Sequence, residues 1–104
     1  MSRQSKNQST HDRCVRALAN ELKDKGWKVQ ADLPNFDQPD PIGDDGRIPD
    51  ILATRRSRTK IVEVETPSTV DAHQEQHSTF RHSAAQRKNG EFELVVTKPR
   101  KSNH

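Results

Sequence analysis

The chain is 104 residues long, the size of a single domain, and its 18 Lys and Arg exceed its 15 Asp and Glu, for a formal net charge of +3. Hydrophobic residues make up only 28% of it, so the core must be thin, and self-association as a homodimer would help to bury it. Its one cysteine, Cys14, excludes an intrachain disulfide and a zinc site built from several thiolates.

We expect one soluble, cytoplasmic domain over residues 1–104, with flexible basic tails at about 1–8 and 98–104. Both tails are polar and show no hydrophobic period. No apolar stretch approaches the about 20 residues of a membrane span, and the start of the chain lacks the apolar segment of a signal peptide. The excess of basic over acidic residues suits a polyanionic partner, and we do not expect the protein to bind a membrane.

The first predicted element is a helix over residues 10–25. Its apolar side chains recur at helical spacing from Cys14 to Leu22, and Gly26 supplies the stop. Glu21 lies at the border of this apolar stripe, where it could face a neighbouring cleft.

Residues 27–33 alternate apolar and polar side chains, the period of a strand with one face in water, and a loop rich in Pro and Asp follows. The remaining predicted elements are strands at 48–54, 59–66 and 91–97 and a second helix at about 70–86. The order α, β, β, β, α, β predicts an α/β domain.

The short turn between the second and third strands brings acidic residues together. If it centres between Arg56 and Ser57, Asp50 lies opposite Glu63 in an antiparallel pair, and Glu65 projects to the same side of the sheet. The opposite face, which we assign to the core, carries Ile51, Ala53, Val62 and Val64. A slip of one residue in register would undo this arrangement.

Three clustered carboxylates need a counter-charge. Two of them about 4 Å apart repel by roughly 4 kcal/mol at an effective dielectric near 20. A shared proton, neighbouring cations or a hard divalent ion such as Mg²⁺ would offset that repulsion. The alternative is that these acids are ordinary solvent-exposed strand residues.

The residues Gly46-Arg47-Ile48-Pro49-Asp50, followed on the next strand by Glu63-Val64-Glu65, resemble the motif of the PD-(D/E)XK nuclease superfamily. That superfamily includes type II restriction endonucleases, Holliday-junction resolvases and RecB-type nuclease domains. The predicted elements over residues 10–97 are similar to its common core. The resemblance implies a restriction endonuclease-like αβββαβ core, with a central mixed sheet flanked by helices. It also implies a nuclease that hydrolyses DNA phosphodiester bonds with Mg²⁺ or Mn²⁺ as cofactor.

The resemblance also implies roles for individual residues. Carried over by position, Asp50 and Glu63 would bind the metal, helped by the backbone carbonyl of Val64. Glu21 matches an acid that resolvase-like members place on the first helix.

Gln76, with Phe80 four residues later, is similar to the Gln-x-x-x-Tyr signature of RecB-type members, with Phe in place of Tyr. The motif usually has Lys where this chain has Glu65, which can bind a metal or accept a proton but supplies no positive charge. A minority of restriction enzymes carry Glu here and are active, whereas other members of the superfamily have lost activity. Arg81 and Lys60 are candidates for the missing cation. The expected catalytic residues are Asp50, Glu63, Glu65, Glu21 and Gln76.

Nucleic-acid contacts are expected from basic side chains outside the acidic cluster. Most of these lie at the hairpin turn, roughly 20 Å from the acids at strand rise. Contacts with phosphates there would give affinity without sequence preference. The residues expected to bind DNA, or RNA as the alternative, are Arg47, Arg55, Arg56, Arg58, Lys60 and Arg81.

Two other functions stay open. A catalytically silent nucleic-acid-binding or assembly module would keep the fold, and Glu65 and the small size favour it. A zinc site from His73 and His77, four residues apart on one helix face, has no third ligand evident in the sequence. We assign Cys14 to the core, and Trp27 to core packing first and base stacking second.

Overall fold

The computed structural model describes residues 6–97, with side chains from residue 9 onward. It contains two α-helices, one short 3₁₀ helix and four strands: α1 Lys6–Asp24, β1 Lys28–Ala31, β2 Ile51–Arg55, β3 Arg58–Glu65, η1 Val70–His73, α2 Gln74–Gln86 and β4 Gly90–Val96. The predicted order of elements is confirmed. Of the tails expected at about 1–8 and 98–104, residues 1–5 and 98–104 lie outside the described part of the chain. Residues 6–8 belong to helix α1, so the prediction of a tail is wrong there.

The helix predicted at about 70–86 is divided into η1 and α2, and β3 and β4 each begin and end one residue earlier than predicted. The ends of the three other elements differ from the prediction, each for a local reason. Helix α1 begins at Lys6 instead of residue 10, because the polar residues there cost a helix little and its hydrogen bonds continue past the apolar stripe. Strand β1 ends early because the N–H of Leu33 bonds to the carbonyl of Ala31 in a tight turn. Strand β2 starts late because Pro49 has no N–H and the N–H of Asp50 bonds to a side chain.

The four strands form one mixed sheet in the order β1-β2-β3-β4. The first two pairs are antiparallel, and β3 and β4 run parallel. Ile51 pairs with Val62 and Arg55 with Arg58, so the turn is centred between Arg56 and Ser57, as predicted. The chain is therefore an α/β domain with the expected hairpin register.

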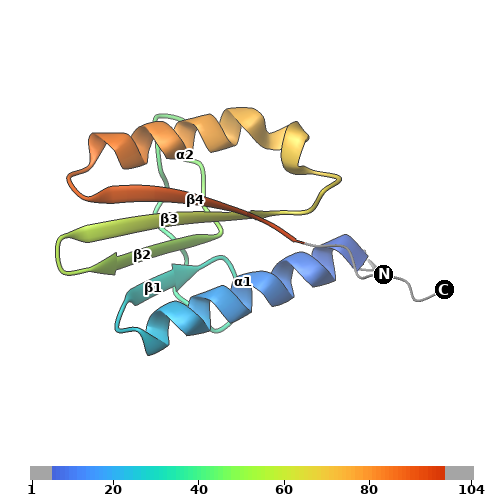
Figure 1. The fold of residues 1–104 in the computed structure, drawn as a ribbon, viewed down its shortest axis with the longest axis horizontal. Coiled ribbons are helices and arrows are strands. Elements are labelled where there is room, and N and C mark those ends of the chain that lie inside the picture. Colours follow the sequence, from blue (N-terminus) through green and yellow to red (C-terminus); the bar gives the residue numbers. More distant parts are fainter. Residues whose placement is uncertain (1–5, 98–104) are drawn as a thin grey trace.

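The two helices pack on opposite faces of the sheet (Figure 1). Helix α1 buries Val15 and Ala19 against β1 to β3, and α2 buries Phe80 and Ala84 against β3 and β4. The four residues predicted to form the core face of the hairpin, Ile51, Ala53, Val62 and Val64, all lie in the α1 core, as expected. Their neighbours in sequence therefore point toward α2.

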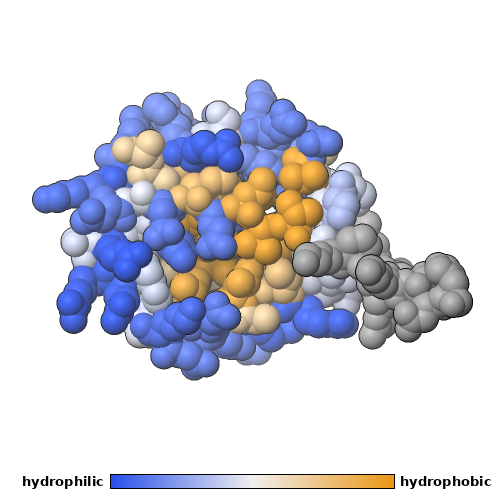
Figure 2. Space-filling view, viewed as in Figure 1, coloured by the Kyte–Doolittle hydropathy of each residue, from blue (hydrophilic) through white to orange (hydrophobic). Residues whose placement is uncertain are grey.

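Trp27 and Cys14 both belong to the α1 side. Trp27 is buried in the core and Cys14 packs against it, as assigned. Figure 2 shows apolar side chains gathered between the two helices on the face seen in Figure 1. Among the described residues, no helix is both long and apolar enough to cross a membrane.

The packing of α2 generates a first prediction. Phe80 is fully buried and its ring centroid lies 6.2 Å from that of Phe92 on β4. We expect Phe80→Ala to lower the free energy of unfolding by about 3–5 kcal/mol, since it removes a large apolar side chain and leaves a cavity. Urea unfolding followed by circular dichroism measures this. Val96→Ala, at a side chain that is 41% exposed, should cost far less, and equal costs for the two variants would contradict the assignment.

Candidate metal centre

The three acidic residues of the predicted cluster lie where β2 begins and β3 ends. Glu63 and Glu65 are each only 3% exposed, and the Asp50 side chain is 15% exposed. The alternative of solvent-exposed strand residues is therefore wrong. The acids do not line an open face of the sheet either, because α2 packs over β3, which carries Glu63 and Glu65, and His11 of α1 contacts Asp50.

Asp50 and Glu63 are joined by hydrogen bonds that cross between the strands. The N–H of Asp50 donates to Oε1 of Glu63 at 2.8 Å, and the N–H of Val64 donates to Oδ2 of Asp50 at 2.8 Å. Gln76 donates from Nε2 to the second oxygen of Glu63 at 2.7 Å. Helix α2 thus brings Gln76 to the site, as expected. Val64 was expected to act through its carbonyl, but its contact with Asp50 is made by its N–H.

Helix α1 contributes a residue that the sequence analysis missed. His11 places Nε2 3.1 Å from Oδ2 of Asp50, and its Nδ1 3.1 Å from Asp12. The hydrogen bond and charge of Asp50 raise the pKa of His11 to about 9, against the opposing effect of burial. The sequence feature that could have revealed His11 is its position one helical turn before Cys14 and Val15, on the buried side of the helix.

The structure does not bring Glu21 to the site. Its side chain is 61% exposed and pairs with Lys25, with 3.7 Å between the charged atoms. Glu21 lies ten residues along the helix from His11, about 15 Å at the rise of an α-helix. The helical wheel places a residue on a face but carries no information about its position along the sheet.

Glu65 is held by donors from η1 and α2. Oε2 lies 2.7 Å from Nε2 of His77 and 2.8 Å from Nδ1 of His73, and Thr69 donates to Oε1 at 2.8 Å. Burial alone would raise the pKa of Glu65, but the hydrogen bonds from His77, Thr69 and His73 hold it below its ordinary value. Glu65 is therefore an ionised group in neutral solution.

Glu63 has the opposite character. Burial and the neighbouring charge of Asp50 raise its pKa to about 8, although the hydrogen bonds from the Asp50 N–H and from Gln76 act against the shift. In neutral solution the carboxyl group of Glu63 is therefore mostly protonated and uncharged. The repulsion expected between the carboxylates is relieved in part by this proton.

One group in the cluster has the spacing of metal ligands. Glu63, Glu65 and His77 each offer a ligand atom, and these atoms lie within 4.8 Å of one another. Carboxylate oxygens and imidazole nitrogens are donors that divalent ions accept, so the residues present fit such an ion. The sequence analysis had considered His77 with His73, without a third ligand. In the structure His77 is grouped with Glu63 and Glu65 from β3, and His73 is not part of this ligand group.

Neither candidate for the missing cation forms an ion pair with the three acids among the described residues. Lys60 pairs with Glu91 at 3.8 Å and Glu93 at 3.6 Å, along β4. Arg81 stacks over Phe92, 5.3 Å from the ring centroid, one helical turn after His77. Of the two, Arg81 is on the helix that covers the acids.

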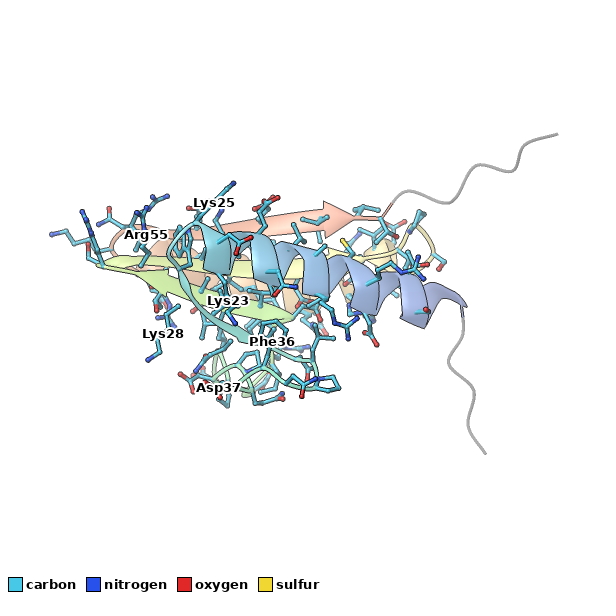
Figure 3. The ribbon with its side chains drawn as sticks, turned by 90° about the horizontal axis from the view of Figure 1, so that it is seen from below. Lys23, Lys25, Lys28, Phe36, Asp37 and Arg55 are labelled. Atoms are coloured by element: carbon cyan, nitrogen blue, oxygen red, sulfur yellow. The ribbon has the colours of Figure 1, made fainter. Side chains whose placement is uncertain are left out.

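The other basic residues gather mostly at the far end of the hairpin. Arg55 and Arg56 are exposed at the turn, and Figure 3 shows Arg55 at the end where Lys25 and Lys28 also lie. Arg58 pairs with Glu91 at 3.2 Å and stacks over Trp27 at 5.1 Å.

Arg47 is the exception, since it belongs to the loop before Asp50. It lies 3.6 Å from Asp45, and its Nε is buried without a hydrogen-bond partner among the described residues.

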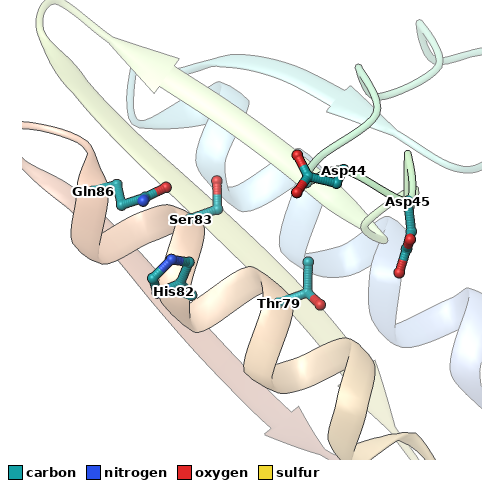
Figure 4. Close-up of a pocket in the computed structure, with 7 residues that line it drawn as sticks. Asp44, Asp45, Thr79, His82, Ser83 and Gln86 are labelled. Atoms are coloured by element: carbon teal, nitrogen blue, oxygen red, sulfur yellow. The ribbon is translucent and has the colours of Figure 1, made fainter.

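The hollow shown in Figure 4 is separate from the acidic cluster. It lies between the loop at residues 43–45 and α2, has a volume of about 460 Å³, and includes Asp44, Asp45 and His82. Both aspartates are exposed.

Comparison with protein-family models finds no match for this chain, and comparison with curated proteins finds none either.

The raised pKa of Glu63 generates a second prediction. Between the ordinary value of 4.5 and about 8, the folded protein holds a proton that the unfolded chain has released. The free energy of unfolding should therefore fall as pH rises through this range, by up to about 1.4 kcal/mol per pH unit. Glu63→Gln keeps a neutral side chain, so the variant should show a flatter profile and exceed the parent in stability at pH 8.

Thermal and urea unfolding at several pH values measure this effect. His11 adds a separate decrease in stability as pH rises from 6.5 to about 9, which the variant retains. Glu75→Gln, at an exposed residue of α2, is the control and should follow the parent curve. A Glu63→Gln curve parallel to the parent between pH 5 and 8 would show that this carboxyl does not hold the proton.

Proposed function

We propose that the protein is a divalent-metal-dependent nuclease that hydrolyses DNA phosphodiester bonds, with Mg²⁺ or Mn²⁺ as cofactor. The observation that carries the proposal is the direct hydrogen bond between the backbone of Asp50 and the carboxylate of Glu63, at 2.8 Å. It places the two acids of the PD-(D/E)XK-like motif side by side at neighbouring strand ends. Asp50 and Glu63, with the carbonyl of Val64, would hold the ion.

The protein groups around the two acids orient them. Gln76 fixes one oxygen of Glu63, while His11 and the N–H of Val64 both contact Oδ2 of Asp50. The Oδ1 atom of Asp50 accepts no hydrogen bond from the described residues, so it keeps its lone pairs for another partner. A bound divalent ion supplies Lewis acidity toward a phosphoryl oxygen and lowers the pKa of water. Glu65 stays ionised and can accept a proton.

Basic side chains at the hairpin turn support a long polyanionic substrate. Arg55 and Arg56 are exposed at the end of the molecule that also carries Lys25 and Lys28 (Figure 3). The length of β3, at a rise of roughly 3.3 Å per residue, separates these arginines from the acids. Contacts at both places would suit a nucleic-acid backbone that runs along the hairpin.

A catalytically silent nucleic-acid-binding module is the second candidate, and one observation favours it. Glu65, which stands where the motif usually has Lys, already accepts hydrogen bonds from Thr69, His73 and His77. A carboxylate with these partners can stabilise the fold even in a protein that catalyses no reaction.

Cleavage assays decide between the two functions. The parent chain, mixed with plasmid and oligonucleotide DNA, should cleave in Mg²⁺ or Mn²⁺ and be inactive in chelator. Asp50→Asn should lower the rate by about 100-fold or more while DNA binding persists, because it removes a charge at the reacting centre. Asp37→Asn, at an exposed loop residue, is the matched control and should retain the rate. A parent chain that binds DNA but never cleaves it would leave the silent module in its place.

Salt dependence tests the basic end. DNA affinity, measured by fluorescence anisotropy, should fall steeply between about 50 and 200 mM salt. Replacing both Arg55 and Arg56 with Ala should reduce the slope of log affinity against log salt by about 2, because each arginine would neutralise one phosphate. Arg16→Ala, on the exposed side of α1, should leave the slope unchanged. An unaltered slope in the double variant would place the phosphate-binding residues elsewhere.

A further inference from the structure

Two histidines of α2 and η1 meet a carboxylate that comes from β3. His73 and His77 lie on either side of Glu65, with nitrogen-to-oxygen distances of 2.8 and 2.7 Å to the same oxygen, Oε2. Glu63 completes the group with a further carboxylate under the same helix. The tertiary structure thus places His77 beside two acidic residues of β3, with His73 in contact with one of them.

We propose that Glu63, Glu65 and His77 form a binding site for a divalent transition-metal ion such as Zn²⁺. This site binds such an ion in preference to Mg²⁺. Ligands of one ion with bonds of about 2.1 Å lie no more than about 4 Å apart. The three ligand atoms here fall within 4.8 Å of one another, so small side-chain adjustments bring them onto one ion. Water completes the coordination.

The imidazole decides which ion the site prefers. Mg²⁺ binds oxygen ligands and keeps several waters, whereas Zn²⁺ binds nitrogen readily and accepts four ligands of mixed type. His77 is only 4% exposed, so its ring cannot turn away into solvent to leave an all-oxygen site. Its Nε2 faces Glu65, and the ion would replace the proton that the two groups share.

His73 supports the same site from outside the ligand group. Its Nδ1 reaches both oxygens of Glu65, at 2.9 and 2.8 Å, and half of its ring is exposed. A partner that fixes a ligating carboxylate raises metal affinity without touching the ion. Thr69 holds Oε1 of the same carboxylate, so Glu65 is oriented from two directions.

An approach for the ion exists beside His77. A hollow of about 390 Å³ is lined by His77 together with Asp71, Gln74, Ser78 and Arg81. Val70 and Leu94 complete the lining, and Asp71 and Gln74 are exposed. An ion could therefore reach the imidazole along α2 without opening the apolar core.

If the protein is the nuclease proposed above, an ion at this site also replaces a missing positive charge. Glu65 stands where the motif usually has Lys, which supplies positive charge near the attacked phosphate. A cation held by Glu65 and His77 would restore positive charge at that place. The metal site itself is inferred from the ligand geometry and does not depend on catalysis.

Zinc titration of the full chain tests the site without reference to activity. Isothermal titration calorimetry should show one Zn²⁺ bound per chain at least about 100-fold more tightly than Mg²⁺. Long-range ¹H–¹⁵N spectra, which report each imidazole nitrogen, should shift Nε2 of His77 on addition of Zn²⁺ and leave it unmoved with Mg²⁺. This spectrum is recorded on the unaltered protein, so it does not depend on a variant that folds.

Variants assign the ligands. His77→Gln and Glu65→Gln should each weaken Zn²⁺ binding by about 100-fold or more, and His73→Gln by about 10-fold. His82→Gln, at an exposed histidine of the same helix, should bind as the parent does. Asp50→Asn should retain Zn²⁺ binding even where it abolishes cleavage, which separates this site from the proposed function. Equal affinity for Mg²⁺ and Zn²⁺, or Zn²⁺ shifts confined to His11, His82 or His104, would overturn the proposal.

Discussion

The register of the β2–β3 hairpin is the constraint on which the acidic cluster depends. Just before the start of β2, where Pro49 cannot donate, side chains join the two strands: the N–H of Asp50 bonds to Glu63 and the N–H of Val64 bonds to Asp50. Each acid thus satisfies the backbone of the opposite strand. The same bonds that end the hairpin hold the two carboxylates next to each other, so fold and site cannot be separated at this point.

Among the described residues, hydrogen bonds and protons offset the burial of the three acids, and no Lys or Arg of that part of the chain forms an ion pair with them. His11 reaches Asp50 from α1, Gln76 reaches Glu63 from α2, and Glu65 lies against imidazoles. Helices on opposite faces of the sheet therefore contribute to one cluster (Figure 1). A cluster neutralised by exchangeable protons is suited to a metal ion, because an ion can take the place of a proton where a fixed Lys would repel it.

The acidic cluster and a group of exposed basic side chains lie at opposite ends of the hairpin. Exposed basic side chains, Arg55 and Arg56 among them, lie at the turn, and the acids lie at the other end of β3. A substrate with regularly spaced negative charge could contact the basic end while one of its phosphates meets the acidic cluster. This arrangement suits a polymer better than a small molecule, in keeping with the nuclease that we propose.

The sequence by itself determined the element order, the hairpin register and the core face of β2 and β3, because strand alternation and a short turn are local properties. It could not determine burial of Glu63, nor that His77 and not Glu21 would meet the acids. Those facts depend on how α1 and α2 lie along the sheet, which is decided by packing between residues distant in the chain. Periodicity assigns a side chain to a face, whereas only the tertiary structure sets its place on that face.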